Sequence, residues 1–380
     1  MKTNTITAVP RLRFPDFISD VGWKIEKLEE VTHSISSGKD NKVSNGDYLL
    51  YGSTGIIGET DKASHIGSYI LVARVGANAG LLNYVTGKFG VSDNTLVISV
   101  KKTKANINFI YYFLTSFRLN KLVFGSGQPL ITGKQLKSIE FGLPNIAEQQ
   151  KIADCLSSLD DSIDAEIQQL ESLKVHKAGL LQNLFPAEDE TVPNYRFPEF
   201  ENNVSWEEKS LNSICHFVRG PFGGALKKDI FVKDGYAVYE QSHAIYGAFD
   251  SFRYYINQEK FDELKRFEVK PDDLIMSCSG TMGRFSRIPK SPKKGVINQA
   301  LLKLTVKKEY STSFIKNALE LPLNQSKLLS QSAGGAVKNV VGVSLIKQIT
   351  IAVPNIDEQN RIADCIFSLD NLIESQSNKI

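Results

Sequence analysis

The sequence contains two copies of one unit, and this duplication limits the possible fold more than any other feature. Residues 143–163 read LPNIAEQQKIADCLSSLDDSI and residues 353–373 read VPNIDEQNRIADCIFSLDNLI, with 13 of 21 positions identical. A second pair is VPRLRFPDFISDVGWKIEKL (9–28) and VPNYRFPEFENNVSWEEKSL (192–211). The first pair is offset by 210 residues and the second by 183, so the second copy is longer by their difference of 27 residues. We expect two domains with similar frames and different recognition surfaces.

Length and composition allow both copies to fold. The chain has 380 residues, 42% of them apolar, which supplies two cores of ordinary size. The four cysteines show no CxxC spacing, and Cys155 and Cys365 hold equivalent positions, where buried thiols are a simpler interpretation than a metal or redox site. The N-terminus has no apolar signal segment, and no run of 18 apolar residues occurs. We therefore expect a cytoplasmic protein without a membrane span.

Charge is unevenly distributed along the chain. Residues 9–142 carry 16 basic and 11 acidic groups and residues 192–352 carry 23 and 16, whereas residues 143–191 carry 3 and 10. The densest basic run, 284–308, has eight Lys or Arg, among them Lys293 and Lys294, and no acid. This pattern predicts that the globular segments bind a polyanion. An ordinary solvated loop and strand edge remains the alternative for the basic run.

The duplicated segments begin two helices. Asn145 with Glu148, and Asn355 with Glu358, have the spacing of a capping box. Apolar residues then recur every three or four positions, which predicts a narrow seam for one partner helix, and the economical arrangement is an antiparallel pair. The alternative is two unrelated helices, each packed on its own domain. The seam residues are Ile152, Leu156, Leu159, Ile163, Leu170, Leu173, Leu180 and Leu184 in the first copy and Ile362, Ile366, Leu369, Ile373 and Ile380 in the second.

The segments between the motifs have the pattern of mixed α+β domains. Residues 69–102 and, in the second copy, 273–289 and 296–308 are strand-like, while 108–122 and 313–329 are helical in pattern. Glycine-rich turns follow at 125–144 and 333–354, and 185–194 is a polar linker. We expect a globular domain over 1–142, a helical spacer over 143–186, a second domain over 187–352 and a shorter helical spacer over 353–380.

The order of these motifs, present twice, resembles the specificity subunit of type I restriction-modification systems. The residues that carry the resemblance are the RFPxF segment followed by Trp, the VARVGANAG strand turn, and the PNIxEQxxIADCxxSLD helix start. It covers nearly the whole chain. The resemblance implies two target recognition domains joined by an antiparallel coiled coil, which read a bipartite site on double-stranded DNA. It also implies two methyltransferase (modification) subunits that carry S-adenosylmethionine, restriction translocase subunits that use ATP and Mg²⁺, and no cofactor in this chain.

One departure from the family pattern lies at the C-terminus. The first helix continues past Leu170 through residues 171–185, whereas the second stops at Ile380, the counterpart of Leu170. We expect a shortened helical pair there, which puts normal docking of one modification subunit in doubt.

The motifs of catalysis are absent from the sequence. No Asn-Pro-Pro-aromatic loop of an adenine methyltransferase is present, and Gly38-Lys39 and Gly133-Lys134 lack the other residues of a P-loop. A nuclease-like set of Glu199, Glu207 and Lys209 is not kept in the first copy, where Asp16, Lys24 and Glu26 take its place. We therefore expect a non-catalytic subunit.

Candidate DNA contacts are polar residues in turns and at strand ends, because such side chains hydrogen-bond base edges and phosphates. We expect Arg74 and Arg284 to be the best candidates, in similar places of the two domains. The first-domain candidates are Tyr51, Ser53, Thr54, Arg74, Asn78, Lys88, Asn94 and Gln128. The second-domain candidates are Arg219, Lys227, Lys228, Gln241, Ser242, His243, Ser279, Thr281, Arg284, Lys293, Lys294 and Lys338. The competing function is a bivalent protein-binding scaffold on a coiled-coil rod, and a stand-alone methyltransferase would need the missing motifs.

Overall fold

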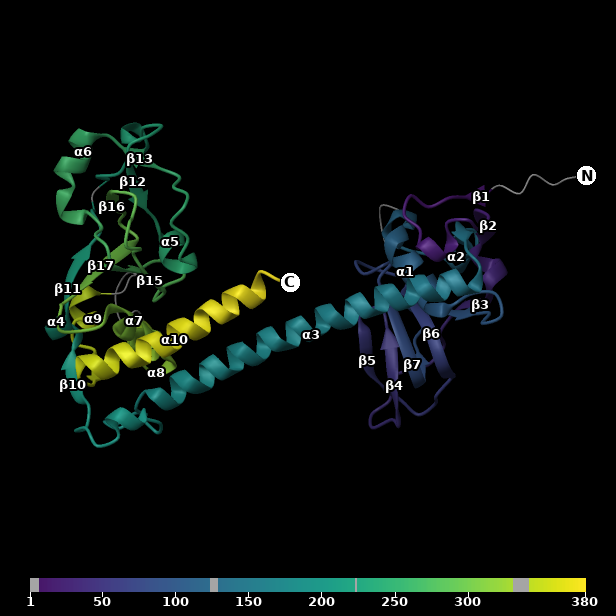
Figure 1. The fold of residues 1–380 in the computed structure, drawn as a ribbon, viewed down its shortest axis with the longest axis horizontal. Helices are drawn as coiled ribbons and strands as arrows, with labels where there is room; N and C mark the ends of the chain where they lie inside the picture. The colour runs from purple at the N-terminus through teal and green to yellow at the C-terminus, as the bar shows by residue number, and fades with distance from the viewer. Residues whose placement is uncertain (1–6, 124–128, 223, 331–341) are drawn as a thin grey trace, which may run out of the picture. The chain divides into compact units, whose positions relative to one another are not determined.

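The structure, a computed structural model, describes residues 7–123, 129–222, 224–330 and 342–380. The chain divides into two compact units, Met1–Ala165 and Glu166–Ile380, each with its own sheets and core (Figure 1). The division falls within α3 (Ile146–Leu184), whose first part belongs to the first unit and whose second part belongs to the second. Each unit thus combines a mixed α+β body with part of a long helix.

The first unit is built on a six-stranded sheet and a small three-stranded sheet. In order across the large sheet the strands are β3 (Thr32–Ser37), β8 (Thr95–Val100), β6 (His65–Ala73), β7 (Leu82–Val91), β4 (Tyr48–Gly52) and β5 (Gly55–Thr60). The small sheet contains β1 (Thr7–Ala8), β2 (Trp23–Lys27) and β9 (Glu140–Leu143). Apolar residues of β6 and β8, such as Ile70 and Ile98, are fully buried with Ile110 of the helix that follows them.

The strands of the second unit, β10–β18, form three sheets. The first sheet has the order β11 (Cys215–Arg219), β17 (Leu301–Val306), β14 (Leu274–Ser277), β15 (Phe285–Arg287). The second has the order β13 (Tyr255–Ile256), β12 (Tyr236–Tyr239), β16 (Gly295–Ile297), and the third pairs β10 (Glu207–Ser210) with β18 (Thr350–Val353).

Strand register shows that the two frames are equivalent. In the first unit Ile98 faces Ile35 on one side and Ile70 on the other, and in the second Leu304 faces Phe217 and Leu274 in the same way. Each unit also has one parallel pair at the corresponding place, β4 with β7 and β12 with β16. The duplication predicted from the helix motifs is therefore confirmed in the sheets, where little sequence identity remains.

The helices follow the pattern expected from the sequence with two exceptions. The predicted helix over 108–122 ends at Phe117, because Arg118 adopts the left-handed conformation with φ 57°, and a 3-10 helix over Leu119–Leu122 follows. The predicted helix over 313–329 is two helices, α7 and α8, because Pro322 at the start of α8 disfavours helical geometry at Leu321. The α-helices are α1 (Ile107–Phe117), α2 (Gly133–Lys137), α3, α4 (Leu211–Ile214), α5 (Gln241–Tyr246), α6 (Gln258–Glu263), α7 (Thr312–Glu320), α8 (Pro322–Ser330), α9 (Val343–Ile346) and α10 (Ile356–Ser377). Short 3-10 helices span Pro15–Phe17, Leu28–Val31, Leu119–Leu122, Pro198–Phe200, Lys228–Ile230 and Lys265–Phe267.

The later part of α3 packs antiparallel to α10 within the second unit. Lys177 forms an ion pair with Asp370, and Gln376 Nε2 donates to the Glu166 carbonyl at 3.0 Å. A residue later in α3 therefore contacts a residue earlier in α10. Ile362 and Ile366 of α10 are buried in the core of the second body, so this part of α10 packs on its own domain, as in the alternative; Leu369 is buried as well. The seam prediction is wrong for Leu159 and Ile163, whose side chains are 55% and 50% exposed, and for Ile380, which is 54% exposed.

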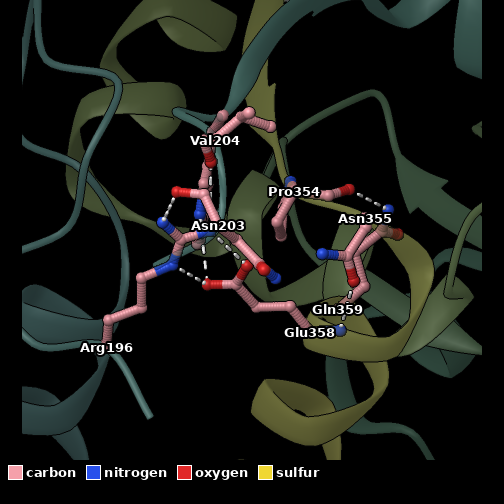
Figure 2. A network of polar contacts seen from close by, with 8 residues as sticks. Arg196, Asn203, Val204, Pro354, Asn355, Glu358 and Gln359 are labelled. Carbon is pink, nitrogen blue, oxygen red and sulfur yellow. Dashed lines mark hydrogen bonds and ion pairs between the residues drawn. The ribbon is translucent and has the colours of Figure 1, made fainter. Parts of the chain in front are cut away.

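The capping boxes form only in part, because the glutamates have another partner. Asn355 Oδ1 accepts the Glu358 amide at 3.0 Å, as an N-cap should. The Glu358 carboxylate, however, is 1% exposed and accepts both Arg196 Nε and Nη2 at 2.7 Å in a two-pronged ion pair (Figure 2). Its hydrogen bonds raise the pKa of Arg196 above the usual value. The RFP segment is thereby fastened to the first turn of α10.

The first unit repeats this ion pair with Arg13 and Glu148, again at 2.7 Å through both nitrogens. The next residue of each helix has a second task. Gln359 Nε2 donates to the Pro354 carbonyl at 2.8 Å, and its Oε1 accepts the Ser311 amide at the start of α7. Gln149 does the same with Pro144 and with the Asn106 amide before α1. The repeated Glu-Gln pair therefore connects three separate segments in each unit.

Removing the carboxylate should destabilise the second unit strongly. In Glu358→Gln, Arg196 keeps its charge in a buried site without its counterion, which costs about 3–5 kcal/mol of unfolding free energy. Denaturant unfolding, followed by Trp206 fluorescence in a Trp23→Phe background, reports on this unit because these are the two tryptophans of the chain. Asp357→Asn, on the exposed side of the same turn, is the control. Equal midpoints for the two variants would contradict the role of the ion pair.

Candidate nucleic-acid interface

Three loops of the first unit are held together by the segment between β7 and β8. The Ser92 amide donates to the Tyr51 carbonyl at 2.9 Å, the Arg74 amide to the Asn94 carbonyl at 3.0 Å, and the Gly38 amide to the Thr95 carbonyl at 3.0 Å. These bonds join the carboxyl ends of β3, β4 and β6. We call residues 38–40, 51–54, 74–78 and 92–94 the first loop edge.

The second unit has the same three hydrogen bonds. The Asn298 amide donates to Tyr239, the Cys278 amide to Ala300, and the Gly220 amide to Leu301, at 2.9, 2.9 and 3.0 Å. We call residues 219–222, 239–243, 278–284 and 298–300 the second loop edge. Here Gln241 also braces the edge, because its side chain accepts from Ser279 Oγ at 3.0 Å and donates to the Thr281 carbonyl at 3.3 Å.

One glycine in each edge permits the close approach of the chains. A Cβ atom on Gly38 would lie 2.1 Å from the Val91 carbonyl oxygen, and one on Gly220 would lie 1.8 Å from the Asn298 carbonyl oxygen. No side chain fits at such distances, so only glycine allows the first strand of each body to pass the loop that carries polar side chains.

An arginine occupies each edge but comes from different strands. Arg74 follows β6, and its equivalent in the second unit is Cys278, since their amides make the same bond. Arg219 ends β11 opposite Leu302, and its equivalent is Ser37, opposite Leu96. Arg74 Nε and Arg219 Nη1 are buried atoms with no hydrogen-bond partner among the described residues. Both guanidinium groups thus keep unused donor capacity beside exposed turns.

A family model for the type I restriction modification DNA specificity domain matches residues 20–175 and 203–380. The chain belongs to this family. It is a DNA specificity subunit, the non-catalytic recognition component of a type I restriction-modification system.

Similar proteins support this assignment. The type I restriction enzyme MjaVIII specificity subunit of Methanocaldococcus jannaschii is 22% identical, over 80% of this chain and 73% of its own length. The putative MjaX specificity subunit of the same organism is 25% identical, over 93% and 82%. The solved structure of a type I S subunit from M. genitalium has the same fold, with a TM-score of 0.65 at 18% identity, covering 98% of this chain and 95% of that one.

The candidate residues of the first domain lie in the following places. Tyr51, Ser53 and Arg74 are half-buried in the first loop edge, and Thr54, Asn78 and Asn94 are exposed there. Lys88 lies outside this edge, exposed on β7 opposite Ile66. Gln128 lies outside the described residues, as does Lys338 of the second set.

In the second loop edge, Arg219, Gln241 and Ser279 are half-buried and Ser242, Thr281 and Arg284 are exposed; Lys227 and Lys228 are exposed on the loop after β11. His243 is 5% exposed, approaches the Ser251 carbonyl at 3.1 Å and stacks on Phe252, so its burial and its partners argue against the predicted DNA contact. Arg284 is equivalent to Leu81, since their carbonyls accept from Ser277 and Ala73. Arg284 and Arg74 therefore lie in the corresponding loops of the two units, but at different positions within them.

Lys293 and Lys294 lie at the opposite end of β16 from the second loop edge. The Ala237 amide, at the start of β12, donates to the Lys294 carbonyl at 2.9 Å, whereas the edge follows the carboxyl ends of β12 and β16. Their ammonium groups lie over Tyr255 and Tyr236, 5.8 and 5.5 Å from the ring centroids. Lys293 and Lys294 are therefore separate from the second loop edge.

A small polar cavity in the second loop edge was missed by sequence reasoning. It has a volume of about 240 Å³, and its lining includes Glu240, Asn298 and Gln299, with Lys228 and Tyr254. Carboxylate and amide groups are base readers, and the signal that could have found them is their place directly after the buried strands β12 and β16. Phe222 beside it is 67% exposed.

The nuclease-like set does not come together as a metal site in the part of the chain that the structure describes. No group of three His, Cys, Asp or Glu side chains that could hold a metal occurs among the described residues. Glu199, from the nuclease-like set, instead pairs with Arg361 at 3.0 Å, while Glu207 pairs with Lys209. Burial raises the pKa of the Cys278 thiol to about 11, so it stays protonated. Among the described helices, none is both long and apolar enough to cross a membrane.

Adding one methyl group at either glycine should impair one loop edge only. Gly220→Ala forces β11 away from Asn298, and we expect altered recognition of one half of the DNA target with the other half retained; Gly38→Ala should do the reverse. Sequencing of methylated sites in cells that carry each variant measures this. Gly179→Ala is the control, because its Cβ would meet nothing within 4 Å on α3. Loss of both half-sites in either edge variant, with folding intact, would contradict independent edges.

Proposed function

We propose that this specificity subunit binds a bipartite site on double-stranded DNA, with one loop edge for each half of the site. The observation that carries the proposal is the shared backbone frame: the same three hydrogen bonds hold the loops in both units, while the side chains on them differ. A common frame with different polar groups suits two similar docking modes that read two different base sequences.

Charge supports the assignment of DNA to the bodies. Residues 192–352 have 23 basic and 16 acidic groups, and residues 9–142 have 16 and 11. Neutralisation of phosphates by such groups supplies much of the affinity of DNA-binding proteins. Arg74 and Arg219 are the strongest candidates for base or phosphate contacts in their edges, since each has a buried donor atom without a partner among the described residues.

We propose further that two modification subunits bind the helical segments of this chain and methylate adenine using S-adenosylmethionine. Restriction translocase subunits that use ATP and Mg²⁺ complete the complex, which acts in the cytoplasm. The acidic character of residues 143–191, with 3 basic and 10 acidic groups, supports partners other than DNA for these segments. The subunit itself directs the reaction by placing the enzyme on its target.

Methylome sequencing tests the proposal directly. Cells that express this chain with its cognate modification subunit should show a bipartite motif with methylated adenine. Arg219→Ala should weaken specific binding by about 1–3 kcal/mol and relax one half of the motif, and Arg74→Ala should relax the other. Arg287→Ala is a matched control, because this arginine is already paired with Asp272 at 2.8 Å. A methylated motif without two separable halves would refute the proposal.

Salt dependence separates DNA recognition from the scaffold alternative. Neutralised phosphates lower log K by about 0.9 per log unit of salt for each contact, whereas a protein scaffold shows no such DNA affinity. Lys293→Ala and Lys294→Ala should each flatten the slope by about one unit and weaken all DNA sequences alike. Lys316→Ala, paired with Glu320 on α7, is the control. Unchanged slopes in both lysine variants would remove this patch from the DNA surface.

A further inference from the structure

A large groove lies in the second unit, apart from the residues of the second loop edge. Its volume is about 770 Å³, which is within the range of sites that hold a sizeable ligand segment. Five parts of the chain form it: the last turns of α3, the linker after it, β10, the α7–α8 junction, and β18. Its lining includes Ala178, Leu181, Phe185, Leu321, Leu323 and Ile351 as apolar members.

The rim of the groove is acidic. Glu188, Asp189 and Glu190 of the linker, Glu208 of β10 and Glu320 of α7 all belong to the lining, against Lys327 as the cation of the same set. All five acids are exposed. Glu320 pairs with Lys316 at 2.7 Å, whereas the other four carboxylates make no hydrogen bond or ion pair with another described residue. Unpaired negative charge therefore surrounds an apolar floor.

This combination excludes DNA and selects a particular kind of protein. Phosphates would be repelled by the rim, and a purely apolar segment would leave the carboxylates without partners. A segment with apolar side chains on one face and Lys or Arg on its flanks satisfies both parts, because charge complementarity guides its approach and the floor buries its apolar face.

We propose that the groove is the docking site for a basic, amphipathic segment of a partner protein. This rests on the proposed function for the partner's identity, which is the modification subunit. The net charge of the groove is opposite to that of the DNA-binding bodies, so one surface of the unit takes the nucleic acid and another takes the enzyme. The groove is a more specific docking site than the acidic helical segments alone. Its acids come from three segments that lie together only in the folded unit.

Two variants of the full chain test the proposal by different means. Glu188→Gln/Glu190→Gln/Glu208→Gln removes charge from the rim, and Ala178→Trp fills the groove from an exposed position of α3. The matched controls are Glu259→Gln/Asp262→Asn/Glu263→Gln and Glu259→Trp, at exposed positions of α6 that do not line the groove. Calorimetry measures the Kd for the purified cognate modification subunit, and the DNA affinity of the isolated chain is measured in parallel.

Both groove variants should raise the Kd for the modification subunit tenfold or more, while the controls change it less than twofold and all retain the DNA affinity of the wild type. The charge variant should also show a weaker dependence of this Kd on salt. Wild-type affinity for the modification subunit in both groove variants would overturn the proposal. Sedimentation that shows a wild-type dimer, lost in the groove variants, would overturn it in favour of a second copy. If the wild-type chain showed no specific DNA binding, this result would instead refute the proposed function.

Discussion

The fold depends on two buried ion pairs between an arginine of the RFP segment and a glutamate of a helix first turn. Burial of a carboxylate is costly unless both oxygens have charged or hydrogen-bonding partners. Glu358 meets this requirement with two nitrogens of Arg196 and with Trp206 Nε1 at 3.3 Å. Arg196 in turn donates to the carbonyls of Asn203 and Val204, which fixes the loop that leads into β10. The pair therefore aligns the start of the body with the start of the helix.

The neighbouring glutamine extends this alignment to the body's end. Gln359 joins the residue before α7 to the proline before α10, and Gln149 performs the same task around α1. Because these contacts hold both ends of each body, the sequence between the two ends can vary. This explains why the sequence identity of the copies is concentrated in the RFP segment and helix start, while the second body holds inserted helices such as α5 and α6 without loss of the shared strand register.

The sequence predicted the parts of the structure that depend on local pattern. The duplication, the long helices and the strand-rich bodies could be predicted, because they depend on the spacing of apolar residues and on motifs that occur twice. The capping boxes were predicted only in part, since spacing alone cannot show that Glu148 and Glu358 face an arginine more than 130 residues away. Likewise His243 follows a strand as a DNA contact would, yet the aromatic rings of Phe249 and Phe252 enclose it. Such outcomes depend on tertiary packing.

The loop edges show the same limit in a form that bears on specificity. The sequence placed Arg74 and Arg284 in roughly similar parts of the two bodies. Both do lie in the loop after equivalent strands, but strand register gives Cys278 and Leu81 as their counterparts. The second edge has a further arginine, Arg219, which comes from β11. Because backbone hydrogen bonds fix where the strands end, a side chain from either strand can reach this place without moving the frame. Recognition can therefore change by exchange of single residues at strand ends, and the buried ion pairs that hold the frame need not change with it.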